Sequence, residues 1–204
     1  MSIIGSIPEI DSKNNLYNTC IAINQEGNLA AVHRKIHLFD INIPGKATYK
    51  ESDTFKSGDK ITIFDTGFCK IGLGVCYDIR FAEYALVMCQ KKGAQILIYP
   101  GSFSMGTGPY HWDLLLRARA IDNLCYVIGS CTARFTQDSS VYWAWGHSRL
   151  VDPFGQVKVS CEYEEAILYH DVDLDYLDQI RAQIPIYQQK RYDIYEVIDK
   201  KSNI

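Results

Sequence analysis

The segment Lys70–Glu83, KIGLGVCYDIRFAE, constrains the fold more than any other because its hydrophobic period changes at Cys76. Before the cysteine, apolar residues alternate with glycines, which is typical of a strand that lets a neighbouring backbone or ligand come close. After Asp78, apolar residues recur at helical spacing as far as Gly93, which predicts a helix with Asp78 as its N-cap. We therefore expect Cys76 where a strand ends and a helix begins.

That position gives Cys76 two interpretations. At the start of a helix, free backbone N–H groups and the positive end of the dipole stabilise a thiolate and, during a reaction, an oxyanion. A thiol whose free pKa is roughly 8.5 becomes a nucleophile in such a place. The alternative is that Cys76 is a small core residue that closes an apolar strand. The segment alone does not decide between them.

Composition indicates one globular domain. The 204 residues are 47% hydrophobic and 22% charged, enough for a proper core. A net charge of -3 gives no reason to expect nucleic acid or an anionic membrane as a partner. No apolar run is long enough to span a bilayer, and MSIIGSIPEI lacks the basic region and apolar core of a signal peptide.

The cysteines point to a reducing compartment. There are seven, none forms a CxxC pair, and they lie inside apolar segments, so we expect free thiols and a cytoplasmic protein. We expect no metal site, because the histidine pair His33 and His37 has no cysteine or second histidine pair at ligand spacing.

The first part of the chain reads as strands followed by a loop. A buried strand is expected over residues 1–8. Tyr17–Asn24 and Leu29–Ile36 predict a hairpin in which Gly27 takes a positive φ. Leu38–Ser57 has no clean period, and loops of that length inside a compact domain tend to be functional.

The remainder alternates strands with helices. A hairpin is expected through Gly67, a buried parallel strand over Gln95–Pro100, and a helix from Asp173 as N-cap to Pro185. A further helix is expected over LLLRARAIDN, and further strands over residues 124–130, 142–151, 157–160 and 166–172. This alternation predicts an α/β class with a mixed sheet.

Several motifs in one order carry a resemblance that covers essentially the whole chain. They are HRKIHLFD, PGK-x4-ES, GVCYDIRFAE, YPGSF, GTGPYHWDLLLRARAIDN, WGHS and IPIYQQKRYDIY. Together they resemble the carbon-nitrogen hydrolases of the nitrilase superfamily, and most closely the omega-amidase branch. The resemblance implies an αββα sandwich with mixed β-sheets over residues 1–183, a C-terminal arm over 184–204, and a homodimer.

Carried over by position, the resemblance assigns Cys76 as the nucleophile, Lys35 as the catalytic lysine and Glu51 as the glutamate that orients the lysine or the attacking water. A carboxamide is a poor electrophile, so its developing oxyanion needs fixed donors. The Lys35 ammonium and the Tyr77 backbone N–H would supply them. Without the motifs, Lys35 and Glu51 read as solvated charges.

The distal carboxylate of a substrate needs a donor, for which the sequence offers four candidates, Arg80, Arg134, Thr107 and His111, without choosing among them. Arg80 could instead form an ion pair with Glu83 on one helix. Arg134 could instead be solvated at the end of a buried strand.

The resemblance implies 2-oxo dicarboxylic monoamides, 2-oxoglutaramate and 2-oxosuccinamate, as substrates. They would be hydrolysed through a thioester without a metal or organic cofactor. Deaminated glutathione is the alternative substrate.

The general-base glutamate of the family precedes the strand matched to MSIIGSIPE and has no counterpart in these residues. We therefore expect a family fold that lacks its first strands and helices, with activity lower by the roughly 10²–10⁴-fold that a base contributes. The alternative is a catalytically impaired fragment that acts only by association.

Overall fold

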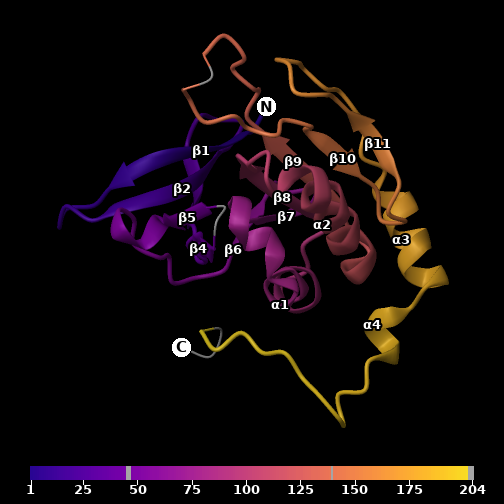
Figure 1. Cartoon of the computed structure of the whole chain (residues 1–204). Helices are drawn as coiled ribbons and strands as arrows, with labels where there is room; N and C mark the ends of the chain where they lie inside the picture. The colour runs from indigo at the N-terminus through magenta and orange to yellow at the C-terminus, as the bar shows by residue number, and fades with distance from the viewer. Residues whose placement is uncertain (45–46, 139, 202–204) are drawn as a thin grey trace.

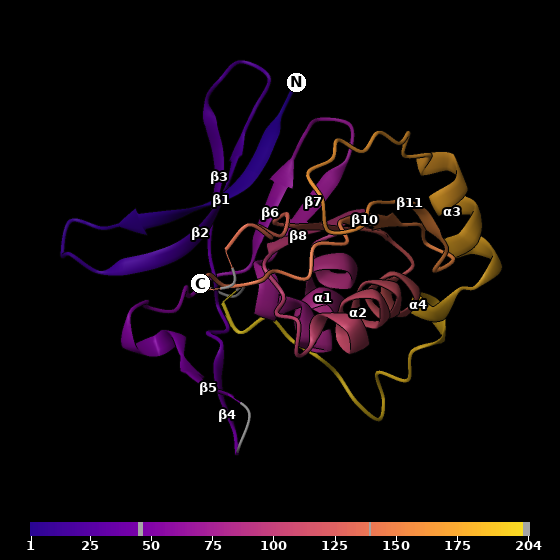
Figure 2. The ribbon, with the colours of Figure 1, turned by 45° about the horizontal axis from the view of Figure 1, so that its top comes forward.

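The computed structural model, which describes residues 1–44, 47–138 and 140–201, is built around two β-sheets (Figure 1). A three-stranded sheet packs on one face of a six-stranded sheet, and helices α1 and α2 cover the other face (Figure 2). The predicted α/β class with mixed sheets is confirmed. No helix among these residues is long and apolar enough to cross a bilayer.

The three-stranded sheet is antiparallel, in the order β1 (Ile3–Ile10), β2 (Leu16–Ile23) and β3 (Leu29–Arg34). The predicted hairpin is confirmed, and Gly27 in its turn has φ +83°. The expectation that the first strand is buried is wrong, since Ile3 is 55% and Ile10 61% exposed. The reason is that β1 is an edge strand, paired with β2 alone within the described chain.

The six-stranded sheet runs in the order β11-β10-β9-β8-β7-β6. Strands β7, β8 and β9 are parallel, and the other neighbours are antiparallel. The strand bounds are β6 Thr62–Asp65, β7 Lys70–Leu73, β8 Ile96–Gly101, β9 Tyr126–Cys131, β10 Arg149–Val151 and β11 Val157–Ser160.

Two predicted strands differ from the structure. The strand expected over 142–151 is reduced to β10, because Gly146 and His147 take positive φ values of 76° and 60° that break the extended conformation. The strand expected over 166–172 does not form. Its apolar side chains Ile167 and Tyr169 are exposed, whereas Val172 at its end packs against the core between the sheets.

The long excursion over residues 38–57 is more regular than predicted. Its described part contains the hairpin of β4 (Asp40–Ile43) and β5 (Ala47–Lys50), and residues 45–46 lie outside that part. The short 3₁₀ helix Glu51–Asp53 follows β5 and turns the chain back toward the sheets.

Four α-helices complete the described fold. They are α1 Ala82–Leu86, which continues as a π-helical turn over Val87–Lys91, α2 Gly108–Asn123, α3 Leu174–Gln183 and α4 Ile186–Gln189. The predicted N-cap of α3 is confirmed, because Asp173 Oδ1 accepts the Tyr176 N–H at 2.9 Å. The helix predicted directly after Asp78 begins later, at Ala82.

The apolar core has two parts. One lies between the six-stranded sheet and helices α1 and α2, and contains the fully buried Trp112, Leu116 and Leu97. The other lies between the two sheets and also receives Leu177 of α3. Helix α2 can approach β9 this closely because residue 129 is a glycine. A Cβ there would lie 2.5 Å from Trp112 and 2.7 Å from Leu116.

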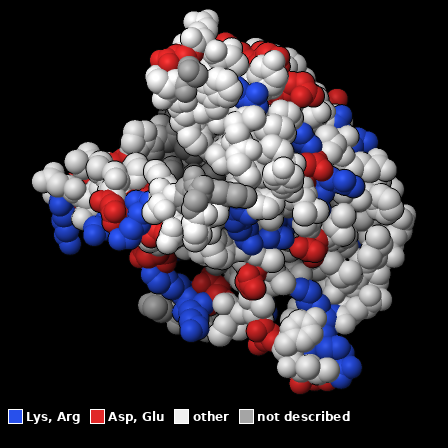
Figure 3. Space-filling model, in the orientation of Figure 1, with Lys and Arg blue, Asp and Glu red and all other residues white. Residues whose placement is uncertain are grey.

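The C-terminal segment beyond α4 runs back across the surface of the same chain (Figure 1). Lys91 Nζ lies 2.8 Å from a Glu196 carboxylate oxygen, and Lys201 Nζ lies 3.0 Å from one of Asp59. The predicted arm therefore has contacts within this chain, up to residue 201. On the face seen in Figure 3, basic and acidic side chains are interspersed without a field of one sign.

We predict that Gly129→Ala lowers the free energy of unfolding by about 1–3 kcal/mol, the usual cost of overpacking a core. The added methyl must push Trp112 or Leu116 away from β9. Urea unfolding of the complete protein measures the effect. Gly5→Ala is the control, since a Cβ there meets nothing within 4 Å. Equal stability of the two variants would contradict the close α2–β9 contact.

Candidate active site

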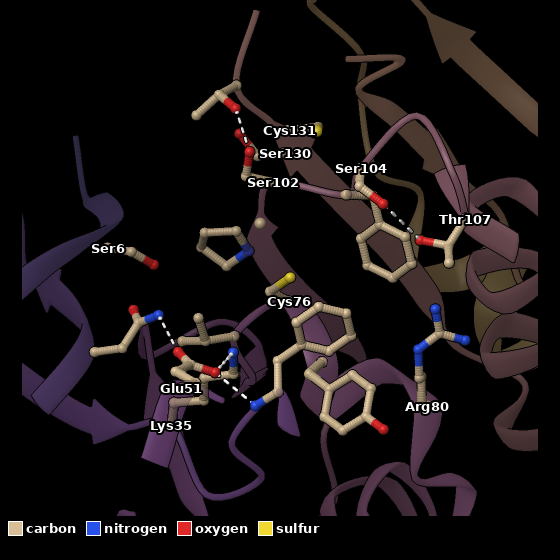
Figure 4. A pocket seen from close by; sticks show the side chains of 18 of the residues that line it. Ser6, Lys35, Glu51, Cys76, Arg80, Ser102, Ser104, Thr107, Ser130 and Cys131 are labelled. Atoms are coloured by element: carbon tan, nitrogen blue, oxygen red, sulfur yellow. Dashed lines mark hydrogen bonds and ion pairs between the residues drawn. The ribbon is translucent and has the colours of Figure 1, made fainter. Parts of the chain in front are cut away.

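A cavity of about 750 Å³ opens beyond the carboxyl ends of the parallel strands β7, β8 and β9. In open α/β sheets this is the usual place for a ligand. Residues of β1, including Ser6, line its opposite wall, so both sheets contribute to it (Figure 4). The wall contains Cys76, Lys35 and Glu51.

Cys76 is the first residue of a 3₁₀ helix, Cys76–Arg80, that follows β7. The predicted position at the end of a strand is confirmed. Its φ of +47° is in the left-handed region, which costs a residue with a side chain on the order of 1–3 kcal/mol. Neighbouring Gly101 leaves the space for this backbone, since a Cβ there would lie 3.1 Å from Cys76 Cα and 3.5 Å from Sγ.

Burial raises the pKa of the Cys76 thiol, and the charge of Lys35 and a backbone N–H at Ser102 act in the opposite direction. The expectation that a helix dipole favours the thiolate is not met, because only a five-residue 3₁₀ turn follows the cysteine. The charges of Glu51 and Asp78 raise this pKa as burial does, so Lys35 and the Ser102 N–H are the groups that favour a thiolate here.

Lys35 and Glu51 form a buried ion pair. Lys35 follows β3, Glu51 begins its own 3₁₀ helix, and their side chains are 3% and 6% exposed. Lys35 Nζ donates to Glu51 Oε2 at 2.6 Å. The same carboxylate accepts the Phe39 N–H at 2.6 Å and the Asn18 Nδ2 amide at 3.3 Å. Reading the two residues as solvated charges is therefore wrong.

Asp78 is not the N-cap of an α-helix, and this prediction is corrected: it is the third residue of the 3₁₀ helix Cys76–Arg80, and α1 begins at Ala82. Its side chain turns back to accept the Val75 N–H on Oδ2 at 2.9 Å. Oδ2 also lies 3.2 Å from His33 Nε2, while Oδ1 accepts the His37 N–H at 3.0 Å and lies 2.7 Å from His37 Nδ1. Burial alone would raise the pKa of Asp78, but these hydrogen bonds outweigh it and hold the pKa at about 2.

Arg80 points into the cavity near Thr107 (Figure 4). Its Nη1 lies 3.1 Å from His111 Nδ1, and the guanidinium lies 5.2 Å from the centre of the Phe103 ring. Among the described residues, Arg80 does not form the alternative ion pair with Glu83. Burial lowers the pKa of Arg80.

The other predicted binding residues separate into two groups. Tyr77 and Thr107 line the cavity, and His111 stands behind Arg80 as its hydrogen-bond partner. The structure does not bring Arg134 to the cavity. Its guanidinium donates to the carbonyl oxygens of Ala144 at 2.9 Å and Trp145 at 3.0 Å.

Sequence reasoning missed a group of hydroxyl side chains on the cavity wall. Tyr142 donates to the Ser102 carbonyl at 2.8 Å, and the Ser102 and Thr132 hydroxyls lie 2.9 Å apart. For Ser102, Ser130 and Thr132, the available signal was their position at the ends of two predicted buried strands. The missed hydroxyl residues are Ser6, Ser102, Ser104, Ser130, Thr132 and Tyr142.

The model of the carbon-nitrogen hydrolase family matches residues 1–182. The chain belongs to the carbon-nitrogen hydrolase family. Among curated members, it is 55% identical over 197 residues to mouse omega-amidase NIT2 and 52% identical over 197 residues to the human protein. Each alignment covers 97% of this chain and 70% of the relative. The resemblance drawn from the motifs is confirmed.

Solved carbon-nitrogen hydrolase structures share the fold. Saccharomyces cerevisiae Nit3, described as a member of branch 10 of the nitrilase superfamily, aligns with a TM-score of 0.81 at 42% identity. It matches 92% of this chain, which spans 65% of the Nit3 chain. The C. elegans NitFhit protein aligns with a TM-score of 0.88 at 35% identity, over 97% of this chain and 48% of its own.

We predict that Asp78→Asn changes the acid stability of the protein. The pKa of Asp78 is lowered from 3.8 to about 2. Its carboxylate therefore contributes stability that is present above pH 3.8 and is lost as the pH falls through about 2. The difference in unfolding free energy between parent and variant should shrink by about 2 kcal/mol between about pH 5 and pH 2. Urea titrations across this range measure it. A difference that does not vary with pH would contradict the assignment.

Proposed function

We propose that this protein is an omega-amidase, which hydrolyses the terminal carboxamide of 2-oxo dicarboxylic monoamides to the 2-oxo acid and ammonia. The substrates would be 2-oxoglutaramate and 2-oxosuccinamate. One observation carries the proposal. The buried Lys35–Glu51 pair shares a cavity with Cys76, and the Arg80 guanidinium projects into that same cavity. The identities to the omega-amidases support it.

Arg80 and Thr107 bind the carboxylate end of the substrate in this proposal. A guanidinium holds a carboxylate through two parallel hydrogen bonds, which also fixes the orientation of the ligand. His111 keeps Arg80 in place from behind, and the Tyr77 and Phe103 rings lie beside the guanidinium at 5.6 and 5.2 Å. The cavity volume is in the usual range for small-molecule sites, about 300–1,000 Å³.

Catalysis then begins at Cys76. Its thiolate attacks the carboxamide carbon, and the oxyanion that forms receives hydrogen bonds from the Lys35 ammonium and the Tyr77 N–H. The Tyr77 N–H is available because the first N–H groups of a helix have no partner within it. The amide nitrogen takes up the proton that the thiol gave up, ammonia leaves, and a thioester to Cys76 remains. Water then hydrolyses the thioester, which releases the 2-oxo acid and restores the thiol.

Glu51 orients Lys35 in this scheme. Both of its carboxylate oxygens already accept hydrogen bonds, from Lys35, Phe39 and Asn18. Such an acceptor holds the lysine side chain in a fixed direction, and can also align the attacking water. A general-base glutamate that accepts the thiol proton stays a prediction.

The proposal includes a reducing compartment, the cytoplasm, and a homodimer. All seven cysteines are free, which supports the compartment. Large apolar side chains on α2 are exposed, among them Tyr110 and Leu114, as are Ile194 and Tyr195 of the C-terminal segment. Exposed apolar surface of this kind supports a subunit contact.

We predict that Cys76→Ala removes turnover of 2-oxoglutaramate, because no thioester can form.

Arg80→Lys should lower kcat/KM about 10–100-fold, because an ammonium cannot replace the paired hydrogen bonds of a guanidinium. Steady-state kinetics of the complete protein, with release of ammonia as the signal, measures both.

Arg134→Lys is the matched control, since Arg134 bonds to backbone carbonyls outside the cavity. Its kcat/KM should change by less than about threefold. Turnover by Cys76→Ala would refute the nucleophile. A parent that hydrolyses deaminated glutathione much faster than 2-oxoglutaramate would replace the proposed substrate with the alternative.

A further inference from the structure

The proposed chemistry requires two segments that follow strands of different sheets to keep fixed positions relative to each other. Lys35 follows β3 of the three-stranded sheet, and Cys76 follows β7 of the six-stranded sheet. The Lys35 backbone bonds to Asn18 and Gly58, at 2.8 Å each. These contacts fix Lys35 on its own side and leave its relation to Cys76 to other groups.

The Asp78 carboxylate contacts both segments. On the cysteine side it accepts the N–H of Val75, the residue directly before Cys76. On the lysine side it contacts the His33 ring and both the ring and backbone N–H of His37. These two histidines bracket Lys35 in the sequence. One carboxylate therefore joins the flanks of both residues.

The environment of Asp78 requires an anion with two accepting oxygens. Its side chain is 0% exposed, and an ionised carboxylate only accepts, so the ring nitrogens that face it carry hydrogens. Stacking of the His37 ring on Phe81, with centroids 3.6 Å apart, fixes that ring from the other side. An asparagine has a single accepting oxygen, and its NH₂ group would face an N–H donor.

We propose that Asp78 is a positioning residue of the reaction, whose carboxylate holds the Lys35 and Cys76 segments together without touching the substrate. This inference rests on the proposed roles of Lys35 and Cys76. Asp78 is absent from the cavity wall, so it acts through its neighbours. The positive φ of Cys76 makes such a restraint necessary, because a strained backbone relaxes when its surroundings release it.

A purely structural role is the alternative, and Asp152 provides the matched control. It is also buried, at 1% exposure, and its Oδ1 accepts the N–H groups of Phe154 and Gln156 at 2.9 Å each. These contacts close a turn that does not line the cavity. Asp152→Asn should therefore lower the melting temperature and leave the reactivity of Cys76 unchanged.

The test measures alkylation of Cys76 by iodoacetamide in the complete protein, followed by mass spectrometry of its peptide, so it needs no substrate. Asp78→Asn is made in the parent and in a Lys35→Met/Glu51→Gln background, which leaves no unpaired buried charge. If Asp78 acts by placing Lys35, Asp78→Asn slows alkylation about tenfold in the parent and less than about twofold in the background. Equal slowing in both would overturn the proposal.

Turnover gives a second readout. Folded Asp78→Asn should lower kcat about 10²-fold while KM changes less than about threefold, because substrate contacts remain and the attack geometry is lost. Unchanged kcat would overturn the proposal. A parent without turnover of 2-oxoglutaramate would count against the proposed function alone, since the alkylation comparison would still decide the role of Asp78.

A second pair of variants covers the case in which Asp78→Asn does not fold. His37→Asn keeps an N–H donor near the place of Nδ1, whereas His37→Ala removes it. Alkylation and kcat should fall about tenfold in His37→Ala and recover to within about threefold of the parent in His37→Asn. Equal rates in the two variants would overturn the proposal.

Discussion

The buried ion pair of Lys35 and Glu51 is the interaction on which the arrangement of the site depends. Two charges removed from water cost several kcal/mol each, and only close geometry with further hydrogen bonds offsets that cost. Here the carboxylate meets the ammonium at 2.6 Å and also accepts bonds from Phe39 and Asn18. The pair therefore fixes β2, the end of β3 and the segment after β5 relative to one another. It also places the Lys35 ammonium on the same cavity wall as Cys76.

The side of the site that contains Cys76 is held by a different set of contacts. Cys76 takes a positive φ at the end of β7, above the space left by Gly101, and its turn is fastened through Asp78. At the other end of this 3₁₀ helix, Arg119 of α2 donates hydrogen bonds to the carbonyl oxygens of Ile79 at 2.8 Å and Arg80 at 3.0 Å. Both sheets and α2 thus converge on one short 3₁₀ helix. Strain at the cysteine persists because its neighbours are fixed on both sides.

Local patterns predicted the parts of the fold that depend on local chemistry. The change of period placed Cys76 at a strand end, and turn and cap residues placed the first hairpin and α3. The exposure of β1 depends on which layers cover a strand, and the short β10 depends on the positive φ values of Gly146 and His147, neither of which alternation alone encodes. At the site, motifs brought Lys35 and Glu51 together, whereas spacing offered Arg80 and Arg134 as equals. Only tertiary contacts distinguish the two arginines. The contacts of Asp78 with both segments could not be predicted either, because the local pattern indicates only a helix cap.

The central claim is that this cavity performs covalent catalysis at Cys76, and the acyl intermediate tests it most directly. The complete protein would be mixed with 2-oxoglutaramate, quenched in acid within one turnover, and digested for mass spectrometry. The account predicts that the Cys76 peptide gains the mass of the 2-oxoglutaryl group and that hydroxylamine removes it. Steady turnover with no adduct on Cys76, or an adduct on a different residue, would contradict it.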